Sequence, residues 1–200
     1  ISGDSNSSNN TLALLLSKLF DSNSVTQVLG DNYRIWNKKS PVWKSLTSLN
    51  PRANNLFQFV NDVLALIHGK NVVAPHYDKD TGVLNHMMEM QTNDVIIVSG
   101  VHTLYSKVLC RKMDLSIYLK VDETLYQYFK LQRGGKYNNL FKIDLLGTED
   151  KENQLDRRKL DIKKYITPQK QQADIIFSLM PVNSNLLNSD KEPSLKLKVS

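Results

Sequence analysis

The chain has 200 residues, of which 40% are hydrophobic and 23% charged, and its formal net charge is +6 at pH 7. This length and composition are typical of one globular domain, residues 1–200, with a sizeable hydrophobic core. No apolar run approaches the roughly 18 residues that a membrane-spanning helix needs. The single cysteine, Cys110, excludes an internal disulfide framework and suits a reducing compartment. We therefore expect a cytoplasmic domain with no membrane partner.

The positive charge raises the question of a polyanionic partner. A basic domain attracts nucleic acid, a membrane surface or a polyphosphate ligand. The lysines are spread along the chain, and neither a zinc-finger spacing nor an aromatic RNA-binding pattern accompanies them. We favour lysines on solvated helix faces and expect no nucleic-acid partner. A polyanion-binding module remains the third-ranked hypothesis.

The first twenty residues combine a strand end, a small polar loop and an apolar helix, which is the order of a phosphate-binding loop. The usual spacing of such a P-loop is G-x-x-x-x-G-K-[ST]. Gly3 holds the first position, whereas Ser8, Asn9 and Asn10 stand where the second glycine, the lysine and the hydroxyl residue are usual. The sequence therefore predicts a polar loop over residues 3–11 that has the frame of a P-loop without its charged chemistry.

The remaining elements alternate between strands and helices. Short apolar runs predict buried strands over residues 25–29, 94–98, 115–119 and 173–179. Helices are expected over residues 11–20 (buried on most faces), 56–67, 104–112, 122–133 and 155–172, the last with a break at Pro168. Loops are expected over residues 37–55, 70–93, 134–153 (a mobile lid region) and 181–194. This order indicates an α/β fold, with a mostly parallel sheet between helices in three α/β/α layers.

Both ends of the chain are strand-like. Only Ile1 and Ser2 precede Gly3, although a P-loop normally follows a complete strand. Residues 195–199 alternate between apolar and basic side chains, as an edge strand does. We therefore expect the chain to be a segment of a longer polypeptide.

Six segments, taken in chain order, resemble the phosphoribulokinase/uridine kinase family of P-loop kinases. They are Gly3-Asp4-Ser5 with Thr11-Leu12-Ala13, then Asp31-Asn32-Tyr33, and residues 49–55, 75–82, 94–104 and 157–174. Because the six are collinear, the resemblance covers nearly the whole chain. It implies a P-loop NTPase-like fold and ATP-dependent transfer of a phosphoryl group to a hydroxyl, with ATP and Mg²⁺ as cofactors.

The resemblance also implies roles for individual residues. Asp31 matches the catalytic base, which accepts the proton of the attacking hydroxyl. Tyr33, Tyr77 and His102 match residues that line the acceptor site. The positions that match the nucleotide and phosphate site are Gly3, Asp4, Ser5, Ser7, Ser8, Asn9, Asn10, Thr11 and Arg133.

Three substitutions fall on the charge-handling positions of that family. Asn9 replaces the phosphate-binding lysine, Asn10 replaces the Mg²⁺-binding hydroxyl, and Ser99 replaces the glutamate at the end of the central strand. A charge-assisted contact contributes roughly 1.5–3 kcal/mol to binding. Loss of all three should therefore leave little activity, although the backbone of such a loop still holds phosphate weakly.

Two main hypotheses remain open. In the first, the chain is a catalytically degenerate domain, a scaffold that binds nucleotide or another phosphate-bearing small molecule weakly and contacts other domains of its own chain or a protein partner. In the second, it is an active kinase whose charge handling has moved. The candidates for the moved charges are Lys38, Lys39, Arg133 and Lys136 for the phosphates and Asp4 and Asp78 for the metal. The histidines show no metal-ligand spacing, so no other metal site is expected.

Overall fold

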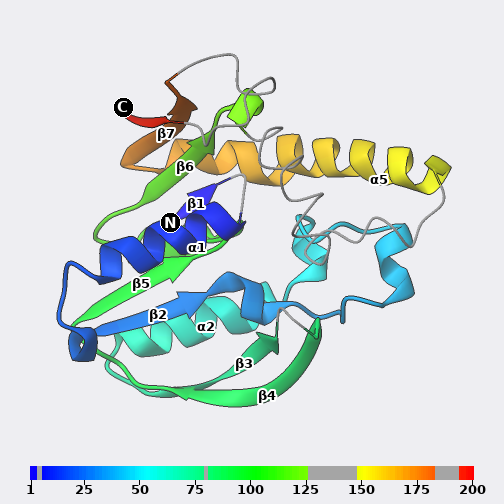
Figure 1. Ribbon diagram of the computed structural model, residues 1–200. Helices are drawn as coiled ribbons and strands as arrows, with labels where there is room; N and C mark the ends of the chain where they lie inside the picture. The colour runs from blue at the N-terminus through cyan, green and yellow to red at the C-terminus, as the bar shows by residue number, and fades with distance from the viewer. Residues whose placement is uncertain (4–5, 79–80, 126–147, 183–193) are drawn as a thin grey trace.

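The computed structural model describes residues 1–3, 6–78, 81–125, 148–182 and 194–200 (Figure 1). Within these ranges the chain forms a mostly parallel sheet between helices. The central strand β1 (Ser2–Gly3) pairs in parallel with β6 (Ile117–Val121), and β6 pairs in parallel with β7 (Ile175–Pro181). β8 (Leu195–Val199) then adds to β7 in the antiparallel direction.

On the other side of β1 the sheet continues through Ile1. The backbone nitrogen of Ile1 donates to Val98 O at 2.7 Å, and Gly100 N donates to Ile1 O at 3.1 Å. These bonds join β1 to β5 (Val95–Ser99), which pairs in parallel with β2 (Val25–Leu29). The strand order is therefore β2-β5-β1-β6-β7-β8, and Figure 1 shows the first five of these strands side by side.

The helices cover both faces of this sheet, as the predicted three layers require. On one face, α1 (Asn6–Ser17) packs with Ala13 against Ile1 and Ile117. On the other face, α2 (Leu56–Ile67) and α3 (Lys107–Cys110) enclose a larger cluster around Val28 and Val98. Neighbouring residues of one strand point to opposite faces, so Ile97 packs towards α1 and Val98 towards α2.

The prediction for α1 was wrong in two respects. The helix begins at Asn6, not at residue 11, so residues 6–10 form its first turns and not an open loop. It is also not buried on most faces, because the sheet takes up only one stripe of it. Ala13 is fully buried, whereas Leu15 is 56% and Leu19 75% exposed.

The predicted loop over residues 70–93 is an antiparallel hairpin of β3 (Val72–Asp78) and β4 (Val83–Met90). Pro75 had suggested a loop because proline cannot donate to a strand ladder. The hairpin tolerates it because the register shifts between Pro75 and Tyr77, and because a two-stranded sheet has an open side for each strand.

The other elements agree with prediction in kind and differ in extent. The predicted strands at 115–119 and 173–179 each start two residues later, because Asp174 Oδ2 accepts from Ser116 N (2.8 Å) and occupies the groups that would otherwise begin the ladder. α5 (Thr148–Asp161) continues as a π turn (Ile162–Ile166), and a 3₁₀ turn (Thr167–Gln172) restarts it around Pro168.

Two further predictions concern residues near the gaps. Asp122 caps the next helix as expected, since its Oδ1 accepts from Thr124 N at 2.9 Å. The remainder of that helix, the lid region up to residue 147 and most of the 181–194 loop lie outside the described residues. No helix in the described part of the chain is long and apolar enough to cross a membrane.

The carboxamide of Gln169 ties β1, the end of β5 and the 3₁₀ turn together. It is 3% exposed, and its Oε1 accepts from Ser2 Oγ (2.8 Å) and Leu104 N (3.0 Å). Its Nε2 donates to Val101 O (2.7 Å) and Tyr165 O (2.8 Å). All four hydrogen-bonding positions of this buried amide are therefore used.

We predict that Gln169→Ala lowers the free energy of unfolding by about 3 kcal/mol, because it leaves several buried polar groups without partners. Chemical denaturation monitored by circular dichroism measures this. The matched control is Gln171→Ala, which changes an exposed glutamine in the same turn. Equal midpoints for the two variants would contradict the role given to Gln169.

Candidate functional site

The site lies where β2 and β5 end, beside the first turns of α1. Leu29 pairs with Ser99, so the residues that follow the two strands emerge together. A Cβ added to Gly30 would lie 3.3 Å from Ser99 O, and one added to Gly100 would lie 3.1 Å from Gly30 Cα. The two glycines therefore allow the strand ends to approach closely, and this brings Asp31 towards Ser99.

A chain of hydrogen bonds connects the three residues that correspond to the family's metal and base positions. Ser99 Oγ donates to Asn10 Oδ1 at 2.9 Å. Asn10 Nδ2 donates to Asp31 Oδ2 over a longer distance of 3.5 Å. The Asn10 carboxamide thus lies between a neutral hydroxyl and a carboxylate, and it uses one atom for each.

Asp31 is buried and also contacts a cation that sequence reasoning had not assigned to the site. Arg34 NH2 lies 3.1 Å from Asp31 Oδ1. The Arg34 guanidinium also lies over the Tyr77 ring, 5.0 Å from its centroid. The spacing of Arg34, three residues after Asp31, was the available signal, since a helical turn brings such residues together.

Asn9 points inward and does not take the place of a phosphate-binding lysine. It is fully buried, and its Nδ2 donates to Gly3 O over 3.4 Å, while its Oδ1 has no hydrogen-bond partner. A Cβ on Gly3 would lie 2.1 Å from Leu119 O. Gly3 is therefore required by the close contact between β1 and β6, whatever its role towards phosphate.

The other predicted phosphate-site residues divide by position. Ser8 is half-buried and Thr11 is exposed, both on α1. Ser7 also belongs to α1, but its side chain is outside the described part of the structure, as are Asp4, Ser5 and Arg133 entirely. Among the described candidates, the structure brings Asn10 to Asp31 and Ser99 and brings Asn9 to Gly3.

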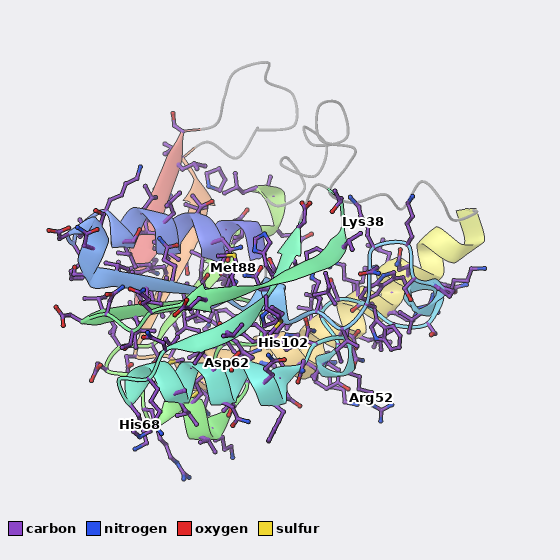
Figure 2. The ribbon with its side chains drawn as sticks, turned by 90° about the horizontal axis from the view of Figure 1, so that it is seen from below. Lys38, Arg52, Asp62, His68, Met88 and His102 are labelled. Atoms are coloured by element: carbon purple, nitrogen blue, oxygen red, sulfur yellow. The ribbon has the colours of Figure 1, made fainter. Side chains whose placement is uncertain are left out.

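Tyr33 lies in the core and not at an open pocket. It is 1% exposed, its ring meets Phe59 edge-on at 5.1 Å, and its hydroxyl donates to Asp62 Oδ2 at 2.9 Å. Burial, together with the adjacent Asp62 charge, raises the pKa of Tyr33, and burial raises the pKa of Asp62. Figure 2 shows Asp62 on α2. These contacts favour a packing role over the predicted contact with a substrate.

His102 is also buried, at 6% exposure, and its Nε2 hydrogen-bonds Leu49 O at 2.9 Å. Burial lowers its pKa to about 4, although Asp31 and Asp161 oppose the shift. The ring is therefore neutral at pH 7, with Nε2 as the donor. In this conformation His102 fastens the loop that contains Leu49, and its role in acceptor binding stays a prediction.

A second carboxylate, Asp161 of α5, joins that same loop. Thr47 Oγ1 donates to Asp161 Oδ2 at 2.7 Å, and Asn50 Nδ2 donates to its Oδ1 at 3.2 Å. Asp161 belongs to the 157–174 segment that resembles the family, but nothing in the sequence paired it with Thr47 and Asn50. The contact crosses 114 positions of sequence, and only the fold establishes it.

The relocated charges of the second hypothesis can be tested in part. Asp78 Oδ2 accepts from Thr81 Oγ1 at 2.8 Å, so this carboxylate is used in the turn of the β3–β4 hairpin. Lys38 N donates to Gly82 O at 2.8 Å, and Figure 2 shows Lys38 near the tip of the hairpin. In the residues that the structure describes, no three His, Cys, Asp or Glu side chains gather into a group that could hold a metal ion.

A parallel sheet with a polar site at its strand ends and an α1 that follows β1 defines a P-loop kinase-like protein. The sequence model of the phosphoribulokinase/uridine kinase family matches residues 1–185. The chain belongs to this family.

Individual relatives agree. The phosphoribulokinase of Synechocystis is 29% identical over 195 residues, which are 98% of this chain and 56% of the relative. The chloroplastic phosphoribulokinase of Chlamydomonas reinhardtii is 27% identical over 89% of this chain and 45% of its own length. A Staphylococcus aureus uridine kinase is 30% identical over 68% of this chain and 67% of the relative. The chain therefore spans about half the length of the phosphoribulokinases it matches.

Solved structures support the same fold at lower sequence identity. The phosphoribulokinase from Rhodobacter spheroides superimposes with a TM-score of 0.72 at 17% identity, over 96% of this chain and 74% of that one. A possible uridine kinase from Bacillus stearothermophilus gives a TM-score of 0.52 at 18% identity, over 88% and 84% of the two chains. These matches confirm the P-loop kinase fold class that the alternating elements predicted.

The described residues do not fit Mg²⁺ and ATP in the way the family implies. Mg²⁺ prefers carboxylate, hydroxyl and water oxygens. Here Asn10 and Ser99 are neutral and bonded to each other, and the buried Asn9 offers no positive charge to a phosphate. The lost chemistry is therefore visible as geometry as well as in sequence.

We predict that the free energy of unfolding falls by roughly 3 kcal/mol as the pH is lowered from about 6.5 to about 4, because His102 must be protonated in the unfolded chain while it stays neutral in the fold. The stability is present above pH 6.5 and is lost as the pH approaches the folded pKa. Urea unfolding at a series of pH values measures the change. In His102→Gln, whose amide also donates to Leu49 O, this pH dependence should disappear from the difference curve. Parallel curves for the two proteins would contradict the assignment.

Proposed function

We propose that this chain is a catalytically degenerate member of the phosphoribulokinase/uridine kinase family, a kinase-like domain that serves as a scaffold and binds phosphate-bearing small molecules weakly. The observation that carries the proposal is the Asn10 carboxamide, which bonds Ser99 on one side and Asp31 on the other. The groups at the metal positions are thereby saturated by each other.

Energetics support this proposal. Phosphoryl transfer depends on charge neutralisation around the transferred group, and loss of one stabilising donor typically lowers a rate about 10²–10³-fold. This chain lacks the lysine, the metal-binding hydroxyl and the strand-end carboxylate together. Losses of this kind are not strictly additive, but their combination leaves Asp31 with no metal-bound phosphate to work on.

Weak anion binding rests on the cationic side of the site. The Nε atoms of Arg34 and Arg157 are buried without hydrogen-bond partners. A buried guanidinium N–H that lacks an acceptor is costly unless an acceptor is supplied. An anionic small molecule could supply one, and the first turn of α1 adds the favourable dipole of a helix N-terminus. Contact with other domains of the polypeptide or with a protein partner is a further part of this proposal.

The second candidate is an active ATP-dependent phosphotransferase. The relatives are named phosphoribulokinase and uridine kinase, and Asp31 occupies the end of β2 where the family's base is expected. In this alternative the metal and phosphate contacts come from the residues outside the described ranges, such as Asp4, Arg133 and Lys136.

Turnover separates the two candidates. We expect no ATP consumption above that of Asp31→Asn with Mg²⁺ and uridine, ribulose 5-phosphate or small alcohols as acceptors. The positive arm is the triple variant Asn9→Lys, Asn10→Ser, Ser99→Glu, which should gain Mg²⁺-dependent ATP binding if the frame of the loop is intact. Its unfolding midpoint is measured alongside as a control for folding. Acceptor-dependent turnover by the unchanged chain that disappears in Asp31→Asn would establish the kinase and end the proposal of degeneracy.

A further inference from the structure

β8 forms the outer strand of the sheet, and all five of its residues are exposed. Leu195 is 43% exposed, Leu197 51% and Val199 59%. Figure 1 shows this short red strand outside β7, at the border of the sheet. No strand of the described chain pairs with its other side. An open edge with large apolar side chains is a template for strand addition.

The backbone of β8 presents a regular set of free groups at this edge. Ile176 and Ser200 exchange two hydrogen bonds, of 2.8 and 3.1 Å, and Val182 N donates to Ser194 O at 2.8 Å. Successive residues of a strand direct their N–H and C=O groups to alternate sides. The N–H and C=O groups of Leu195, Leu197 and Val199 therefore point away from β7, towards the open edge.

The two faces of β8 differ in character. Leu197 and Val199 pair with Leu179 and Phe177, and opposed residues of an antiparallel pair share a face. Phe177 packs with the cluster under α1, so the apolar side chains of β8 lie on the α1 face of the sheet. Lys196 and Lys198 point to the opposite face, where both are exposed.

This arrangement disfavours a second copy of the chain as the partner. If two β8 strands paired with their apolar faces together, Lys196 or Lys198 of one would lie opposite a lysine of the other. Like charges placed directly opposite each other destabilise a strand pair, and lysines on an edge strand are a common protection against such self-pairing. The complementary strand has apolar residues on one face and acidic residues on the other.

We propose that the open edge of β8 is a docking site for a partner protein, which adds an extended strand in which apolar and acidic residues alternate. Main-chain hydrogen bonds to Leu195, Leu197 and Val199 supply the adhesion, as in other cases of strand addition. Carboxylates opposite Lys196 and Lys198 supply the selectivity. The proposal is independent of the kinase site, because β8 lies three strands away from β1.

The test uses a fluorescein-labelled seven-residue peptide that alternates leucine and glutamate, titrated with the 200-residue chain in an anisotropy assay. The control peptide has the same composition with its leucines and glutamates in separate blocks. We expect the alternating peptide to bind about tenfold more tightly, because only its pattern matches both faces of β8. In Lys196→Glu with Lys198→Glu, this affinity should fall about fivefold, and a leucine–lysine peptide should take its place.

Leu197→Pro tests the edge directly. Proline there removes only an N–H that points to the open side, so the pairing with β7 stays intact and the unfolding midpoint should not change. Peptide binding should be lost. Equal binding of the two peptides, or binding that survives Leu197→Pro in a folded protein, would overturn the proposal.

Two other outcomes also overturn it. Concentration-dependent dimerisation in sedimentation that Leu197→Pro abolishes would make a second copy the occupant. If the 200-residue chain binds the peptide but the protein isolated from its source does not, the edge is already covered by the protein's own polypeptide.

Discussion

The carboxamide of Asn10 is the contact on which the character of the site depends. It joins the end of β5, through Ser99, to Asp31 after β2, and it does so with a single neutral group that both donates and accepts. A hydroxyl at position 10 and a carboxylate at position 99 would repel no cation and would leave room for one. An amide bonded to a hydroxyl forms a closed pair with no net charge.

The fold does not need the lost chemistry, since other contacts hold it. Gly30 and Gly100 let β2 and β5 approach at the site, Gly3 lets β1 pass close to β6, and Gln169 joins β1 to the segment after β5. Stability and charge handling are therefore carried by different residues. This separation explains how 98% of the chain can align with a phosphoribulokinase relative while its metal and phosphate positions change.

The sequence predicted those parts of the fold that depend on local pattern. The run at residues 94–98 is β-branched and became β5, and the apolar stripe at residues 56–67 became α2. It missed the β3–β4 hairpin because Pro75 conceals the strand, and it placed the start of α1 too late because asparagine and serine resemble a loop. For the site, sequence named Asp31, Asn10 and Ser99 but not their mutual hydrogen bonds, nor Arg34 and Asp161. Those contacts link residues up to 114 positions apart, and only the packed fold decides them.

Tyr33, Tyr77 and His102 show the same limit for single residues. A resemblance assigns them to an acceptor site, yet all three are at most 6% exposed and are used in packing, in support of Arg34 and in fastening Leu49. The most direct test of the central claim is a calorimetric titration of the chain with ATP, with and without Mg²⁺. The account predicts a dissociation constant in the millimolar range or weaker that Mg²⁺ does not change, since Asn10 and Ser99 offer the ion no charge. Micromolar binding that requires Mg²⁺ would contradict it.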